Sequence, residues 1–394
     1  MVESIAYIVL FGLFFATFMQ RLHLPRLLGM IIAGMVIGPY CLNILDESIL
    51  TISSQIRQIA LIIILTRAGL TLDITDLKKV GRPAILMCFL PALIEILGMI
   101  FFAPKLLGIS TLDAAIMGSV VAAVSPAVVV PKMIQLIDDK LGTEQGIPQM
   151  ILAGASVDDV FVIVMFSAFT GLALGNEINA LSFVQVPVSI FTGIVFGLFV
   201  GYLLALFLKK LNIRNTTAFL ITISISFLLM RFETFIKVYI PFSGLLSIMA
   251  MGLSVGKMNK EVTVDLNHIY SKCWDVAQIF LFVLVGASVN ISYALKAGWA
   301  SVILIICVLL VRMVAVFICL IKTPLNKKER FFTMCAYSPK ATVQAAMGGV
   351  PLSMGLACGE IVLTISVISI LITAPFGAIM MDIFDKKCLK YASK

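Results

Sequence analysis

The amino-acid sequence predicts an all-α polytopic membrane protein with about 13 transmembrane helices arranged as two inverted repeats. Three observations carry this prediction. The composition of the 394 residues is 61% hydrophobic and only 13% charged, with a mean hydropathy of +1.10, whereas soluble domains carry about 25% charged residues. Apolar runs of membrane length recur along the whole chain, and its two halves share short motifs in the same order.

Each transmembrane helix needs about 20 predominantly apolar residues to cross roughly 30 Å of hydrocarbon. The first run is not preceded by basic residues, as a signal peptide would be, so we expect a retained helix. The longest predicted loop, 256–275, is too short for a soluble domain. The predicted spans are 4–19, 26–44, 55–72, 83–102, 112–134, 149–174, 184–208, 217–230, 235–255, 276–291, 299–321, 331–355 and 360–381.

Lysine and arginine are distributed unevenly between the loops. With an odd number of spans the termini lie on opposite sides, and alternate loops carry 21 basic residues on one side against four on the other. Cytoplasmic loops are the basic ones. We therefore expect a plasma (inner) membrane protein with its N-terminus outside and its C-terminus in the cytoplasm. The net charge of +8 fits attraction to anionic lipid, and we expect no nucleic-acid partner.

Cysteine and histidine give no sign of a metal site. The eight cysteines include no CxxC pair, and the two histidines, His23 and His268, lie far apart in predicted loops. Neither a disulfide framework nor a transition-metal centre is expected, and no cofactor either. We expect the protein to act inside the membrane, and we do not expect it to be an enzyme.

The internal repeat rests on two motif pairs. GLTLDI at 69–74 matches GASVNI at 286–291 with an offset of 217, and SPAVVV at 125–130 matches SPKATV at 338–343 with an offset of 213. The offset of 217 also carries Glu95 onto Arg312. Because the matching spans run in opposite directions, the two halves are inverted. Inverted repeats imply alternating access around a site near the bilayer midplane.

Two repeat-equivalent prolines, Pro126 and Pro339, lie within the fifth and twelfth spans, each after a serine. Proline removes a backbone donor and disfavours helix at the preceding residue, so we expect both spans to be interrupted there; a simple kink is the alternative. Irregular backbone at membrane depth is tolerated only where it is buried or lines a cavity. Lys340 follows the second break and is expected to compensate a helix dipole or to pair with an aspartate of 149–174.

Two adjacent aspartates, Asp158 and Asp159, lie in the middle of an otherwise uncharged span. A charge at that depth costs about 2.5 to 3.5 kcal/mol on insertion scales, and it usually marks a functional site. Adjacent helical residues diverge by about 100°, so one carboxylate is expected to face a structural partner and the other a water-filled cavity. Cation and proton would compete for these oxygens, with Ser125 and Ser156 as possible hydroxyl ligands; serines in membrane helices also commonly bond backbone carbonyls.

Glu95 and Arg312 are the single acid and base of their spans. Either would be costly alone, so a buried ion pair between them is the favoured interpretation. The functional alternative is that Arg312 neutralises Asp158 and releases it during turnover.

VSPAVVVP (124–131), GASVDDV (154–160) and SPKATVQAA (338–346) together resemble the monovalent cation:proton antiporter superfamily, specifically its NHA branch of sodium/proton antiporters. The resemblance implies a homodimer with two crossed discontinuous helices and an elevator-like movement. The implied ion-translocating core is approximately 55–174 and 276–381, and the dimerisation domain approximately 1–54 and 180–256. It also implies that Asp159 is the principal carboxylate, Asp158 its partner, and Glu95 with Arg312 the NHA-type pair.

The resulting functional hypothesis is exchange of Na⁺ or Li⁺ for H⁺. Alternatives on the same fold are a K⁺/H⁺ antiporter, a cation channel or a solute symporter. An intramembrane aspartyl protease is the least favoured alternative, because its two carboxylates must converge on one water, whereas adjacent helical aspartates diverge.

Overall fold

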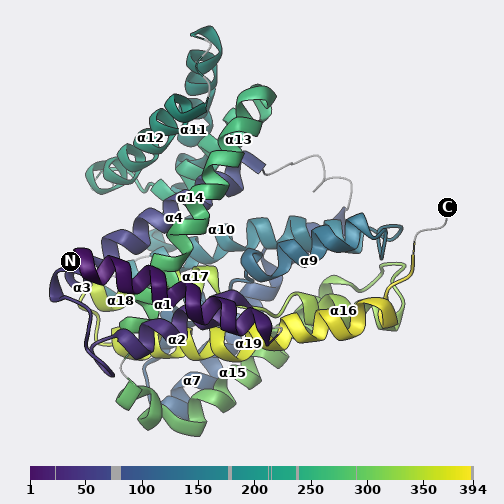
Figure 1. The fold of residues 1–394 in the computed structure, drawn as a ribbon. Coiled ribbons are helices and arrows are strands. Elements are labelled where there is room, and N and C mark those ends of the chain that lie inside the picture. The colour runs from purple at the N-terminus through teal and green to yellow at the C-terminus, as the bar shows by residue number, and fades with distance from the viewer. Residues whose placement is uncertain are drawn as a thin grey trace. The chain divides into compact units, whose positions relative to one another are not determined.

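The computed structural model describes residues 1–22, 24–71, 81–175, 180–211, 213, 215–236, 239–289 and 291–391, and these form helices and their connections (Figure 1). Each predicted apolar run coincides with at least one helix. In the described part of the chain, seven helical segments are long and apolar enough to cross a membrane: 2–21, 82–107, 191–210, 216–236, 262–287, 298–319 and 359–388. Shorter apolar helices account for further predicted spans, so the polytopic all-α fold is confirmed.

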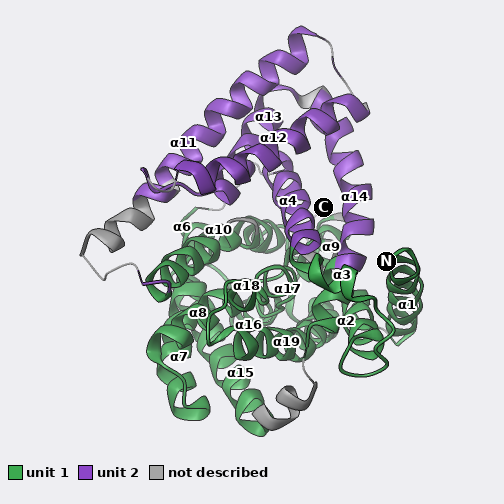
Figure 2. Cartoon of the chain, turned by 90° about the vertical axis from the view of Figure 1, so that its left-hand side faces the viewer, with its two compact units in different colours: residues 1–54, 74–173, 281–394 green, residues 55–73, 174–280 purple. Residues whose placement is uncertain are grey.

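The chain divides into two compact units, which Figure 2 colours separately. The first comprises residues 1–54, 74–173 and 281–394, and the second 55–73 and 174–280. Residues 1–54 therefore belong to the unit that carries the aspartates, although they were predicted to lie in the dimerisation domain. Residues 55–73 belong to the second unit, although they were predicted to lie in the ion-translocating core. The compact units reflect packing, and which part moves during function stays a prediction.

The first unit contains most of the helices. They are α1 (Val2–Arg21), α2 (Arg26–Ile37), α3 (Glu47–Thr51), α6 (Arg82–Met87), α7 (Leu90–Leu107), α8 (Thr111–Val121), α9 (Pro126–Asp138), α10 (Ile147–Ala173), α15 (Ile291–Cys319), α16 (Lys327–Ala336), α17 (Thr342–Met347), α18 (Val350–Ser353) and α19 (Gly359–Cys388).

The second unit consists of α4 (Ser53–Thr71), α11 (Ala180–Lys210), α12 (Asn215–Ile236), α13 (Gly244–Met258) and most of α14 (Lys260–Ala287). The predicted loop 256–275 is wrong, because α14 begins at Lys260 and continues through it. Charged residues suggested a loop, but the buried residues are spaced four apart, as on one face of a helix. These residues are Val262, Leu266, Tyr270 and Trp274.

Helix capping explains where the first halves of the two interrupted spans begin. The Ser110 hydroxyl accepts from the backbone N–H of Asp113 at the start of α8. Asn326 and Glu329 form a reciprocal capping box at the start of α16. Such caps satisfy backbone donors that the first helical turn leaves unpaired. The two interrupted spans therefore start in similar ways as well as breaking at equivalent prolines.

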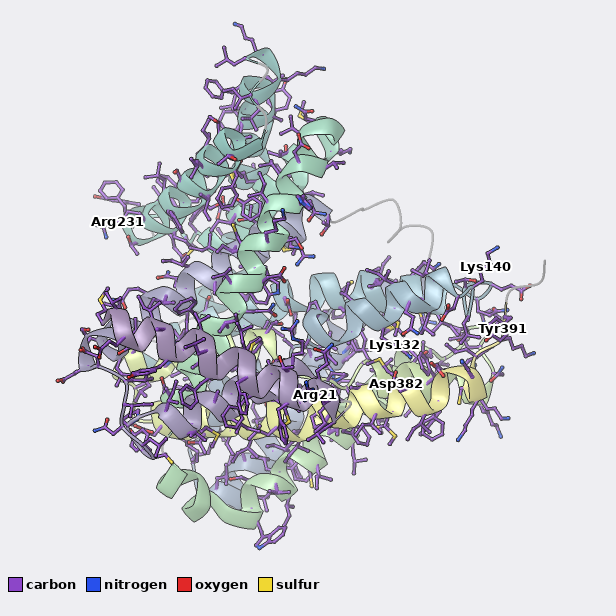
Figure 3. The ribbon with its side chains drawn as sticks, in the orientation of Figure 1. Arg21, Lys132, Lys140, Arg231, Asp382 and Tyr391 are labelled. Carbon is purple, nitrogen blue, oxygen red and sulfur yellow. The ribbon has the colours of Figure 1, made fainter. Side chains whose placement is uncertain are left out.

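Lys132 of α9 forms ion pairs with two aspartates of α19. Its Nζ lies 2.7 Å from Asp382 Oδ1 and 2.8 Å from Asp385 Oδ2 (Figure 3). The Gly142 N–H also donates to the Lys390 carbonyl at 2.8 Å. These contacts fix the chain that follows α19 against the turn that follows α9.

Glycines allow close helix packing inside the first unit, as is common in membrane proteins. A Cβ added at Gly34 of α2 would collide with the Val283 carbonyl oxygen and would lie 2.8 Å from the Ala287 backbone nitrogen of α14. Gly29 and Gly286 have similarly close backbone neighbours. This packing places the end of α14 in the first unit.

Replacement of Gly34 by alanine is expected to lower the free energy of unfolding by about 1–3 kcal/mol, because rigid backbone must move to admit the methyl group. Gly98→Ala is the matched control, since its added Cβ would meet only side-chain atoms of Val311, the nearest at 3.1 Å. Thermal unfolding of the detergent-purified variants measures the difference. Equal melting temperatures for the two variants would contradict this account of α2 packing.

Candidate functional site

The fifth and twelfth predicted spans are both interrupted, as predicted. The α-helical geometry stops after Val121 and resumes at Pro126, and it stops after Ala336 and resumes at Thr342. The two breaks meet, because the Ser125 N–H donates to the Pro339 carbonyl at 2.7 Å. This hydrogen bond pairs a backbone donor in one break with the carbonyl of the proline in the other. The crossed discontinuous helices of the predicted fold therefore share one buried junction.

Side chains from the second half of the chain cap the carbonyls at the end of α8. Lys340 Nζ donates to the Val121 carbonyl at 2.8 Å. Gln344 Nε2 donates to the carbonyls of Val121 and Ala123 at 3.0 and 2.9 Å, and Arg312 donates to that of Ala122. The C-terminus of a helix carries partial negative charge and unpaired carbonyls, which these groups satisfy. Lys340 thus lies where the predicted dipole compensation requires it.

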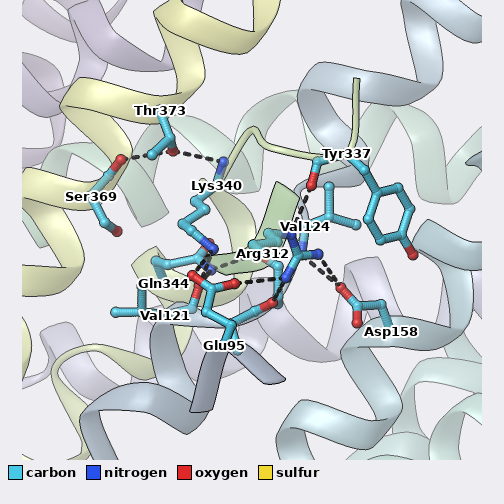
Figure 4. A network of polar contacts seen from close by, with 12 residues as sticks. Glu95, Val121, Val124, Asp158, Arg312, Tyr337, Lys340, Gln344, Ser369 and Thr373 are labelled. Carbon is cyan, nitrogen blue, oxygen red and sulfur yellow. Dashed lines mark hydrogen bonds and ion pairs between the residues drawn. The ribbon is translucent and has the colours of Figure 1, made fainter. Parts of the chain in front are cut away.

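Four buried charges form a continuous chain of ion pairs (Figure 4). Arg312 Nη1 lies 2.8 Å from Glu95 Oε2, and its Nη2 lies 3.0 Å from Asp158 Oδ2. Lys340 Nζ lies 2.7 Å from Glu95 Oε1. All four side chains are fully buried. The predicted pair of Glu95 with Arg312 is confirmed, and the contact proposed as its alternative, Arg312 with Asp158, is present at the same time.

Lys340 pairs with Glu95, and no ion pair with an aspartate of α10 is found for it among the described residues. The interpretation of Lys340 as a partner of α10 is therefore wrong for this conformation. Lys340 lies in the second break, and from there its ammonium reaches the end of α8. The cluster of Glu95, Asp158, Arg312 and Lys340 contains two negative and two positive charges, so it is neutral when all four are ionised.

The two aspartates of α10 have different surroundings. Asp158 is fully buried, and its Oδ2 accepts from the Val124 N–H at 2.9 Å as well as from Arg312. Asp159 points elsewhere, as a 100° step along the helix requires. It is partly exposed, yet its Oδ1 is buried and has no hydrogen-bond partner in the described part of the chain. The Oδ1 of Asp158 also lacks such a partner there.

The two candidate hydroxyl ligands differ in what the structure says of them. Ser125 is buried, and its Oγ accepts from the Thr342 N–H at 3.4 Å and lies 3.5 Å from the Thr342 hydroxyl, both long contacts. The side chain of Ser156 lies outside the described residues. The ligand roles of both serines stay predictions.

Three features of the site escaped the sequence reasoning. A third break separates α6 from α7 at Cys88 and Phe89, although Pro91 was a signal for it. Gln344, on the first turn of α17, also reaches the Val121 carbonyl that Lys340 contacts. The backbone carbonyl of Tyr337 accepts from Arg312 Nε at 2.8 Å, and a backbone contact leaves no trace in residue type.

Comparison with known proteins agrees with this architecture. Residues 6–384 match the family model described as the transmembrane sodium/hydrogen exchanger. The sodium/hydrogen exchangers 9B2 of Homo sapiens and 9B1 of Homo sapiens are 34% and 33% identical to this chain, over 93% of it and 70% and 73% of their own lengths. The sodium/hydrogen exchanger 9B2 of Xenopus tropicalis is 32% identical over 92% of this chain and 69% of its own length.

A solved structure is similar as well. The sodium proton antiporter MjNhaP1 from Methanocaldococcus jannaschii at pH 8 superposes with a TM-score of 0.82 at 20% identity, covering 96% of this chain and 98% of that one. At that identity the likeness establishes the fold alone. Together with the family match, it shows that this multi-pass membrane protein with an antiporter fold belongs to the sodium/hydrogen exchanger family.

Proposed function

We propose that the protein exchanges Na⁺ or Li⁺ for H⁺ by alternating access, with Asp159 as the carboxylate that holds either ion. The observation that carries the proposal is the buried Oδ1 of Asp159, which has no hydrogen-bond partner among the described residues and follows directly on a charge cluster that is already paired. Carboxylate oxygens suit a hard monovalent cation. Asp158 Oδ1, from the adjacent residue, and the Ser125 hydroxyl, at the junction of the two breaks, are candidates for further ligands.

The exchange follows from the cost of an unpaired buried charge. Asp159 must carry either a proton or a cation whenever its surroundings exclude water, since an isolated carboxylate is strongly disfavoured there. Reorientation is then permitted for the protonated and the cation-bound forms and disfavoured for the bare carboxylate. Cation binding on one side releases the proton, and protonation on the other side releases the cation.

The larger-scale features of the mechanism rest on the sequence. We propose an elevator-like movement of the core, 55–174 and 276–381, within a homodimer held together by 1–54 and 180–256. The uneven distribution of basic residues between the loops supports a further part of the proposal: a C-terminus in the cytoplasm, a plasma (inner) membrane location and contact of the basic surface with anionic lipid.

Transport is expected to be electroneutral. Asp158 is held by Arg312, so one proton on Asp159 replaces one monovalent cation. In proteoliposomes with an imposed pH gradient, Na⁺ or Li⁺ should drive proton movement, and clamping the potential from 0 to −100 mV should change the rate less than about twofold. A cycle that moves one net charge would instead gain up to about 2.3 kcal/mol per 100 mV of driving force.

Each other outcome has a distinct meaning. Proton movement driven by K⁺ but by neither Na⁺ nor Li⁺ would favour the potassium exchanger. Steep dependence on the potential would show that a second group, such as Asp158, also changes its charge. Absence of cation-dependent proton movement would contradict the proposal.

A further inference from the structure

Tyr337 occupies the centre of the site without being charged. It ends α16 at the second break and is fully buried. Its backbone carbonyl accepts from Arg312 Nε at 2.8 Å, and the Arg312 guanidinium carbon lies 5.1 Å from the centroid of its ring. Within about 6 Å of an aromatic face a guanidinium is attracted by the ring. Two different parts of Tyr337 therefore contact the residue that joins Glu95 to Asp158.

The Tyr337 hydroxyl is anchored by the third break. It donates to the Met87 carbonyl at 2.9 Å. In a continuous helix that carbonyl would accept from the N–H four residues later, but the residue there is Pro91, which has none. Tyr337 supplies the donor that Pro91 lacks. A buried carbonyl without a donor would be costly, so this hydrogen bond fixes the ring as well as completing the break.

The helix that carries the aspartates makes room for this ring. A Cβ added at Gly154 would lie 2.7 Å from the Tyr337 hydroxyl and 3.0 Å from Met87 Cβ. Gly154 and Asp158 are four residues apart, so they lie on the same face of α10. Only glycine admits the hydroxyl at this distance. The ring therefore lies against the same face of α10 that presents Asp158 to Arg312.

We propose that Tyr337 is a positioning residue that keeps Arg312 on Asp158, with its hydroxyl anchored at Met87 and its ring accommodated by Gly154. The inference rests on the proposed exchange function. It adds that Tyr337, by holding Arg312 on Asp158, limits each transport cycle to one proton. When the anchor is lost, the guanidinium is less well held, and Asp158 takes up a proton in part of the cycles. Each such cycle moves net charge.

The test compares Tyr337→Phe with the wild type in proteoliposomes at clamped potential. The variant loses one hydroxyl, so it should retain exchange within about tenfold while its rate becomes at least about threefold faster or slower between 0 and −100 mV. Tyr270→Phe is the matched control, because Tyr270 is equally buried but belongs to the other compact unit. Its rate should stay independent of the potential.

A second variant examines the same contact from the other side. Gly154→Ala displaces the hydroxyl, so it should also make transport depend on potential. The double variant Gly154→Ala with Tyr337→Phe lacks the atom that the methyl group meets first. It should therefore behave like Tyr337→Phe alone and fall short of the sum of the two single effects, as coupled neighbours do.

Failure of this inference differs from failure of the proposed function. A wild type without cation-driven proton movement overturns both. A wild type that exchanges electroneutrally, together with a folded Tyr337→Phe variant that does the same, overturns only the positioning role. Strict additivity of the Gly154 and Tyr337 substitutions would also overturn it.

Discussion

Replacement of Asp159 by asparagine is expected to reduce cation/proton exchange by at least about 100-fold, because the amide neither takes up a proton nor carries the charge that binds the cation. The same substitution should leave the melting temperature unchanged or raise it. Asp159 Oδ1 has no hydrogen-bond partner in the described part of the chain, so a neutral group of the same shape removes a buried charge without breaking a pair. Flux in proteoliposomes and thermal unfolding of the same preparation measure both effects.

Two comparisons make this result specific. Asp139→Asn changes an exposed aspartate at the end of α9 and should leave exchange intact. Asp158→Asn removes a partner of Arg312 and should lower stability, unlike Asp159→Asn. Exchange by Asp159→Asn at the wild-type rate would refute the assignment of this residue. A large loss of stability in that variant would show that its carboxylate has a structural role.

Replacement of Arg312 by methionine is expected to lower the free energy of unfolding by about 3–5 kcal/mol, the usual cost of breaking a buried ion pair by removing one partner. Two carboxylates, Glu95 and Asp158, lose their contact with the guanidinium. The carbonyls of Ala122 and Tyr337 lose a donor as well. Thermal unfolding in detergent, supported by denaturant titration where it is reversible, measures the loss.

The control for this substitution is Arg231→Met, an exposed arginine on α12 (Figure 3) that should change stability by less than about 0.5 kcal/mol. Glu95 keeps its ion pair with Lys340, whereas Asp158 loses the guanidinium. Combining Arg312→Met with Asp158→Asn removes that uncompensated charge, so the double variant should be more stable than Arg312→Met alone. Equal stability of Arg312→Met and the wild type would contradict the buried network. An Arg312→Lys variant keeps the charge but not the planar fork, and should be intermediate.

Much of this site was readable in the sequence because membrane burial makes polar residues conspicuous. Pro126 and Pro339 predicted both breaks, since proline acts on the backbone directly. Glu95 and Arg312 are repeat-equivalent and are the single acid and base of their spans, which predicted a pair, and the structure pairs them. Helix geometry alone predicted that the two adjacent aspartates would differ, with one carboxylate facing a structural partner and the other not.

Other features depend on three-dimensional placement and were out of reach. Lys340 was expected to compensate a helix dipole or to pair with an aspartate of 149–174, and only the course of the chain through the break brings it to Glu95. Tyr337 looked like an ordinary aromatic residue at a helix end. The helical course of α14 through 260–275 was missed for a different reason: its polar residues were weighed, and the four-residue spacing of its buried ones was not.

Lys340 also bears on how many ions the protein can hold. The end of α8, whose carbonyls have no partner within the helix, is the kind of place where a half-helix attracts a cation. The ammonium of Lys340 already lies there, 2.8 Å from the Val121 carbonyl and 2.7 Å from Glu95. In this structure the chain itself therefore supplies a positive charge at the junction. Under the proposed exchange, Asp159 is then the position left for the ion that is exchanged.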